Sequence, residues 1–149
     1  MSAFRFRLAP VLRYREHLRE ARRWELRALA EERERLTSEI RQLEQLLIRQ
    51  TREMEEQRGR IITIGDLQLQ GDIAQRLLQS IEEKRRLLAV VQKTLEEKRG
   101  EVIQADREVK SLEQLRSRLW ERHRQREGRD EQKLIDEVGQ RRYLDRTRV

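Results

Sequence analysis

The chain has 149 residues, of which 42% are charged, 36% are hydrophobic and only 4% are aromatic, and its net charge is +7. This apolar content is too low to fill a compact core of that length, but it suffices for one narrow apolar stripe along long helices. There is no cysteine, which excludes disulfides and thiolate metal sites. No run of about 18 apolar residues and no signal-peptide pattern occurs, so we expect a cytoplasmic protein without a membrane span.

The excess positive charge lies in the two terminal segments. Residues 1–30 contain eight Arg and three Glu, and residues 116–149 contain eleven basic and seven acidic residues. Residues 31–115 contain sixteen basic and eighteen acidic residues. The terminal segments therefore carry +5 and +4 and the middle carries −2, which favours an acidic or polar partner at the termini.

A first helix is predicted over about residues 8–58. Pro10 suits a first helical turn, where its missing N–H costs nothing. We interpret the spacing of Leu18, Arg22 and Leu26 as a stutter, with the apolar stripe continuing back through Val11 and Leu8. From Leu26 the a and d positions of a heptad repeat, here called the seam, are Leu26, Leu29, Arg33, Leu36, Ile40, Leu43, Leu47, Gln50, Met54, Gln57 and Ile61.

A turn is predicted at about residues 59–65, within a stretch from Gly59 to Asp72 that contains three glycines. Thr63, followed three residues later by Asp66, resembles the cap that starts a helix. A second helix is therefore predicted over about residues 66–145.

The second helix repeats the heptad more strictly than the first, which favours a coiled coil. Because the connection is short, the helices should be antiparallel, with opposed residue numbers adding up to roughly 124. The predicted fold class is all-α: a single domain over 1–149, formed by a long antiparallel two-helix coiled-coil hairpin with a C-terminal helical overhang. The predicted seam positions are Ala74, Leu77, Ile81, Lys84, Leu88, Val91, Leu95, Lys98, Val102, Ala105, Val109, Leu112, Arg116 and Leu119.

The sequence contains no motif of a nucleotide-binding loop, a zinc protease or a dinucleotide-binding fold. His17 and His123 are the only histidines, and His123 falls on an extension of the second seam, where it would face the first helix or its Arg-rich start. A pair of helices also offers no cavity in which a catalytic group is desolvated. We therefore predict no enzymatic activity, no catalytic or metal-binding residue, no cofactor and no small-molecule substrate.

Three kinds of partner compete for the Arg-rich termini. Nucleic acid is disfavoured, because the basic residues are interleaved with acids and the few aromatic residues are spread out. A membrane-surface helix would need a bulky apolar face, of which Phe4, Phe6 and Leu8 are a weak version. An acidic or polar protein socket that grips both termini remains the favoured interpretation.

A second candidate surface consists of apolar residues near the turn that lie off the seam. They are explained equally well by a tightly packed turn and by an exposed docking patch for a second partner. These residues are Leu46, Ile48, Ile62, Ile64, Leu69, Ile73 and Leu78.

Two segments resemble a known family. The run from Phe4 to Glu16 (FRFRLAPVLRYRE) is similar to the start of the flagellar type III export protein FliJ, and the run Glu131–Glu137 (EQKLIDE), followed by Arg141-Arg142-Tyr143, is similar to its C-terminal region. The resemblance implies a stalk-like coiled coil whose termini enter the hexameric flagellar export ATPase. It also implies contact with the cytoplasmic domain of the export gate and with export chaperones, and a peripheral location at the inner membrane through these partners.

The resemblance assigns residues to both partners. The ATPase end would include Phe4, Arg5, Phe6, Arg7, Leu8, Arg13, Tyr14, Arg141, Arg142 and Tyr143. The export-gate end would include Leu46, Ile62, Ile64, Leu69, Ile73 and Leu78. The alternatives are a coiled-coil nucleic-acid-binding or scaffold protein, and the equivalent stalk protein of a virulence type III secretion system.

Overall fold

The structure is a computed structural model that describes residues 2–60 and 62–148. Its elements are α1 (Ala9–Glu56), the short 3₁₀ helix η1 (Gln57–Gly59) and α2 (Ile64–Thr147). The two long helices pack against each other and the described residues form no strand, which confirms the all-α helical hairpin. No helix in this described part of the chain is long and apolar enough to cross a membrane.

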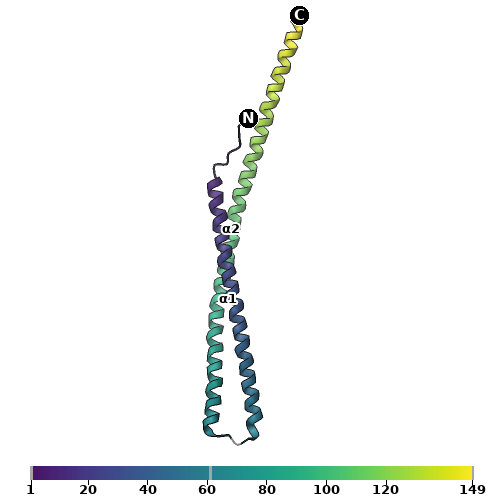
Figure 1. The fold of residues 1–149 in the computed structure, drawn as a ribbon. Coiled ribbons are helices and arrows are strands. Elements are labelled where there is room, and N and C mark those ends of the chain that lie inside the picture. Colours follow the sequence, from purple (N-terminus) through teal and green to yellow (C-terminus); the bar gives the residue numbers. More distant parts are fainter. Residues whose placement is uncertain (1, 61, 149) are drawn as a thin grey trace. The chain divides into compact units, whose positions relative to one another are not determined.

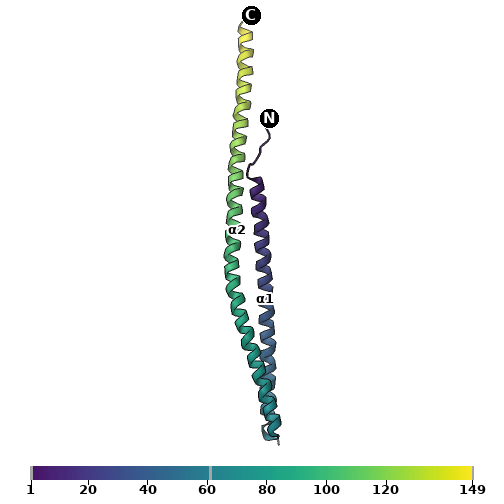
Figure 2. The ribbon, with the colours of Figure 1, turned by 90° about the vertical axis from the view of Figure 1, so that its left-hand side faces the viewer.

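The chain divides into two units, which are treated separately below. The terminal unit contains the residues up to Arg19 and those from Gln104 onward, and the turn unit is Glu20–Ile103. Within each unit, α1 and α2 lie side by side and antiparallel (Figures 1 and 2). The single domain expected over 1–149 stays a prediction.

Local hydrogen bonds determine where the helices begin. The Leu12 N–H donates to the Leu8 carbonyl at 2.8 Å, across the first turn of α1 that contains Pro10. At the start of α2 the Asp66 N–H donates to Thr63 Oγ1 at 3.2 Å. This bond confirms the predicted cap, which satisfies a backbone donor that the helix itself leaves without an acceptor.

The core of the turn unit follows the predicted seam. Leu36 and Ile40 of α1 are buried, as are Ile81 and Leu95 of α2, and all four lie at predicted a or d positions. Their burial removes apolar surface from water, which is the main favourable contribution to the pairing of the helices. Ile61, which the expected seam and turn include, lies outside the described residues.

The core of the terminal unit corrects the predicted stutter. Leu12 is buried together with Ala105 and Val109, whereas Val11 and Leu8 are exposed. An unbroken heptad counted back from Leu26 puts Leu12 at an a position, so the repeat continues without a stutter. The prediction was wrong because arginines occupy the next seam positions, so the apolar residues there do not recur at heptad spacing.

The seam position predicted at Arg116 of α2 is also wrong. Arg116 is exposed, whereas the neighbouring Leu115 is half-buried. The position that faces α1 is therefore Leu115, one residue before the predicted one. The Arg116 guanidinium stays in solvent, where its charge is hydrated.

Ion pairs across the seam determine the register in both units. In the terminal unit, Arg15 pairs with Glu108 at 2.6 Å. In the turn unit, Lys98 pairs with Glu25 at 3.0 Å and Lys84 pairs with Glu39 at 2.7 Å. The residue numbers of each pair add up to 123, which agrees with the expected register of roughly 124.

These contacts change the acidity of the carboxyl groups. The Lys98 ammonium, by hydrogen bonding, lowers the pKa of Glu25 below its ordinary value, and Lys84 lowers the pKa of Glu39 in the same way. A carboxyl group whose pKa is lowered by folding stabilises the folded state at pH values above its unfolded pKa. That stabilisation is lost as the pH falls through the folded pKa.

We therefore predict that the turn unit loses thermal stability as the pH falls below about 4.3, the ordinary pKa of Glu. The measurement is the helical signal in circular dichroism during heating, at pH values between about 3 and 7. In the double variant Glu25→Gln, Glu39→Gln the dependence on pH should be shallower. Equal slopes for the variant and the wild type would show that these pairs do not couple protonation to folding.

Candidate partner-binding surfaces

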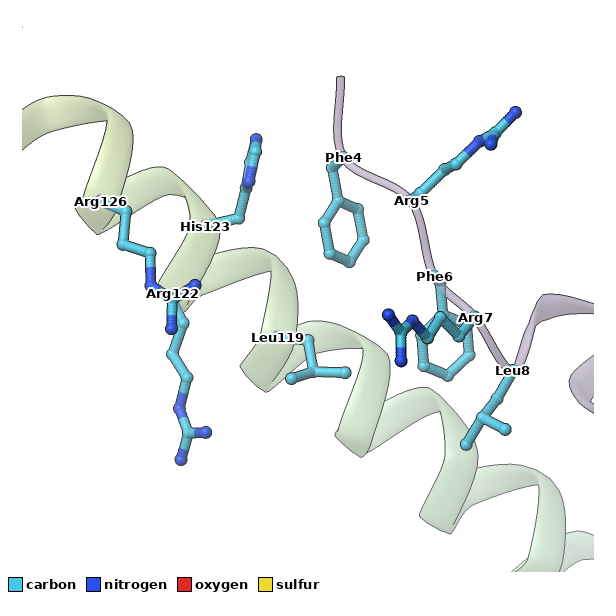
Figure 3. A pocket seen from close by; sticks show the side chains of 9 residues that line it. All are labelled: Phe4, Arg5, Phe6, Arg7, Leu8, Leu119, Arg122, His123 and Arg126. Atoms are coloured by element: carbon cyan, nitrogen blue, oxygen red, sulfur yellow. The ribbon is translucent and has the colours of Figure 1, made fainter. Parts of the chain in front are cut away.

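Residues 2–8, here called the N-terminal strap, precede α1 and lie along α2 within the terminal unit (Figure 3). The Phe4 ring lies 5.6 Å from the His123 ring, measured between centroids, at an interplanar angle of 45°. His123 Nε2 lies 3.1 Å from the Ser2 carbonyl oxygen, to which it donates when it carries the proton. His123 therefore holds the strap on α2, which confirms that it faces the Arg-rich start.

The strap and α2 together form a groove of about 490 Å³. Its apolar part comes from Phe4, Phe6 and Leu119, and the Phe4 ring points toward α2 whereas Arg5 points away from it (Figure 3). These apolar side chains form the floor of the groove, which supplies contact area for a side chain of a partner. The lining residues are Phe4, Arg5, Phe6, Arg7, Leu8, Leu119, Arg122, His123 and Arg126.

Four arginines of this groove have no carboxylate partner within the described residues: Arg5, Arg7, Arg122 and Arg126. The groove lining contains no acidic residue. A short distance along α1, by contrast, Arg15 is paired with Glu108. Within the described residues these four arginines form no ion pair and surround an apolar floor, and the nearest carboxylate contact is that of Glu127 with His123 at 3.2 Å.

A neighbouring groove of about 720 Å³ lies on the same strap. It adds Arg13 and Arg116 to the basic surface and contains one acidic residue, Glu16. The structure thus brings together most of the residues expected at the ATPase end, from Phe4 to Leu8 with Arg13. Tyr14 is exposed nearby on α1, with the Arg15 guanidinium 5.9 Å from the centre of its ring.

The structure does not bring the other expected residues to this place. Arg141, Arg142 and Tyr143 are exposed on α2, beginning 18 positions after His123. At 1.5 Å per residue this spacing is about 27 Å along the helix. Arg122 and Arg126 instead line the groove that the strap forms with α2, and sequence reasoning missed them. The sequence indicates that they share a face of α2 with Leu119, because they lie three and seven positions after it.

Beyond Glu127, α2 has no described neighbour. Every residue of the segment Gly128–Arg148, here called the tail, is exposed. A shallow groove in it is lined by Ile135, Asp136, Gly139, Gln140, Tyr143 and Leu144.

The apolar residues expected at the export-gate end lie in the turn unit, and all are exposed except Ile62, which is half-buried. Ile62 lines a groove at the turn with Met54 and Leu67. Leu69 and Ile73 are four positions apart and share a face of α2. Leu78 follows Ile73 by five positions, so it lies about 140° around the helix. The expected patch is therefore more than one surface.

Two residues extend the face of Leu69 and Ile73. Leu87 and Val90 are exposed, and they lie 14 and 17 positions after Ile73. This heptad spacing keeps them on the same face of α2. Sequence reasoning missed them because charged and polar residues interrupt the stripe between Ile73 and Leu87.

Comparison with known proteins now assigns the family. A model of the flagellar FliJ protein family matches residues 4–148, nearly the whole chain. The chain belongs to the FliJ family. The family is a non-catalytic component of the flagellar export apparatus, and this confirms the resemblance seen in the sequence. No curated protein and no solved structure shows a significant match to the chain.

Proposed function

We propose that this FliJ-family chain is the stalk of the flagellar export ATPase: its termini enter the hexameric ring and promote its assembly and activity. The turn unit links the ATPase to the cytoplasmic domain of the export gate and to export chaperones. The protein thus lies at the cytoplasmic face of the inner membrane through its partners. The observation that carries the proposal is the set of unpaired arginines around the N-terminal strap.

Arg5, Arg7, Arg122 and Arg126 gather around one groove without an acidic neighbour in its lining. Arginines that line one groove create a positive potential there, and an acidic or carbonyl-lined socket complements it. The same charges accelerate the encounter with an acidic partner.

The apolar floor supplies the second part of the recognition. Phe4 and Phe6 are half-buried, so each keeps aromatic surface available to a partner. Aromatic and arginine side chains are the residue types that most often dominate binding energy in protein interfaces. A partner segment that combines carboxylates with apolar side chains fits both features of the groove.

For the export gate, the exposed face of α2 in the turn unit is the proposed contact. Leu69 and Ile73 lie in the part that the family resemblance assigns to the gate, and Leu87 and Val90 continue it. Exposed apolar residues that share one helix face are typical of a protein-binding surface. They fit a gate domain with a complementary apolar groove.

Nucleic acid is the second candidate partner, since the strap combines arginines with two phenylalanines. Binding that neutralises phosphates weakens steeply as salt increases. A titration with DNA at several salt concentrations distinguishes the two partners. We expect no binding to DNA at physiological salt.

The ATPase proposal predicts that the chain stimulates its cognate export ATPase in a steady-state hydrolysis assay. Reversal of Arg5, Arg7, Arg122 and Arg126 to Glu should reduce the stimulation at least about tenfold, because like-charge contacts in an interface cost several kcal/mol. Circular dichroism should stay helical, since these arginines form no ion pair with another described residue.

A matched control reverses the same number of charges elsewhere. Arg41, Arg49, Arg52 and Arg58 are exposed in the turn unit and lie outside the strap. Their reversal to Glu should leave stimulation near the wild-type level. Equal loss in both variants, or full stimulation by the strap variant, would refute the role of the strap.

The gate proposal predicts that Leu69→Ser with Ile73→Ser weakens capture of the gate's cytoplasmic domain while the helical content is retained. Val11→Ser, an exposed apolar position of the terminal unit, is the matched control and should capture normally. Leu95→Ser should instead destabilise the fold by about 3 kcal/mol, because Leu95 is buried. Melting of the Leu69, Ile73 variant as severe as that of Leu95→Ser would show that this face is structural.

A further inference from the structure

The tail, Gly128–Arg148, is a helical segment without a described neighbour in the protein. All of its residues are exposed, including the apolar Leu134, Ile135, Val138 and Leu144. A contact that covers the apolar residues on one face of the tail would remove them from water and stabilise it. The question is which partner its surface fits.

The charges of the tail are divided into two halves of opposite sign. Residues 129–138 contain four acidic and two basic residues, giving −2. Residues 139–148 contain four basic residues and one acidic residue, giving +3. A second tail that runs antiparallel brings each acidic half beside a basic half, whereas a parallel tail brings like charges together.

Gly139 lies where the two halves meet. It has no side chain, and a Cβ atom added there would meet nothing within 4 Å. Ile135, Asp136, Tyr143 and Leu144 line a shallow groove around it. A glycine on an exposed helix face lets another helix approach its backbone closely.

We propose that two copies of this chain associate through their tails, antiparallel, with the two-fold axis beside Gly139. This axis brings Ile135 of one copy level with Tyr143 of the other, and Asp136 level with Arg142. The first pair covers apolar surface and the second forms an ion pair, and symmetry repeats each of them. Gln132 comes level with Arg146, and its amide oxygen would accept a hydrogen bond from the Arg146 guanidinium.

The pattern favours a second copy over an unrelated helix, because in the antiparallel pair each apolar position meets an apolar one and each acidic position meets a basic one. A parallel pair would instead place Asp136 beside its own counterpart and Arg142 beside its own. The contact is smaller than a standard interface, so association should be weak and visible at concentrations on the order of 100 µM. The dimer covers Arg142 and Tyr143, so it competes with any partner that uses these residues.

Sedimentation equilibrium of the full chain over a range of concentrations tests the proposal. The wild type should shift from monomer to dimer mass, and Asp136→Arg should weaken association at least about tenfold through like-charge contacts. Arg142→Asp should weaken it similarly. The double variant Asp136→Arg, Arg142→Asp should restore the dimer, because an antiparallel pair again brings opposite charges level.

The variant Gly139→Leu distinguishes an effect on association from an effect on helix stability. Leu favours a helix more than Gly does, so the helical signal should rise slightly. Association should nevertheless weaken, because the new side chain blocks close approach. A wild type that stays monomeric to several times the expected concentration overturns the proposal. Association that is unchanged by Asp136→Arg would also overturn it. So would a double variant in which association is not restored.

Discussion

Three ion pairs between α1 and α2 place a basic side chain at a seam position, where a purely apolar coiled coil would have leucine or valine. The acidic member of each pair lies next to a seam position of the opposite helix. Lys98 with Glu25 and Lys84 with Glu39 join the helices of the turn unit, and Arg15 with Glu108 does so in the terminal unit. A shift of either helix by one residue would break these contacts and turn the apolar side chains away from each other. The pairs therefore define the register, although each contributes modestly to stability because it is partly exposed.

The same pairing decides which charges remain available to partners. In the turn unit, Glu25 and Glu39 face basic residues of the opposite helix. Around the N-terminal strap, no acid lines the groove of Arg5, Arg7, Arg122 and Arg126. Part of the terminal excess of positive charge is thus a local set of arginines that pair with no carboxylate among the described residues. This is the feature on which the proposed contact with the ATPase depends.

Periodicity was sufficient to predict the helices, their antiparallel register and most of the core, because apolar residues recur wherever the helices touch. Leu12 was missed because Arg15, Arg19 and Arg22 follow it on the seam and interrupt the apolar pattern. The strap alternates apolar and Arg residues and is not helical, so the groove that it shares with Arg122 and Arg126 could not be predicted from helical spacing alone. His123 was placed correctly because it continues the heptad of α2.

The candidate site was predicted only in part. Sequence reasoning grouped Phe4 and Arg5 with Arg141 and Tyr143, because both segments resemble one family and both are basic. The structure brings the strap to the part of α2 around His123 and leaves the tail without a described neighbour. Which residues share a groove depends on where the strap lies along α2, and that information is not contained in either segment alone.

We propose that the arginines around the strap recognise an acidic socket of the export ATPase. The most direct measurement is the association rate constant of the two proteins by stopped-flow mixing, at ionic strengths from about 0.01 to 0.5 M, where the screening length shortens from roughly 30 Å to a few ångströms. The wild type should associate fast at low salt and slow steeply as salt rises, and reversal of Arg5, Arg7, Arg122 and Arg126 should abolish most of this dependence. Identical rates and salt slopes for the two proteins would contradict the account.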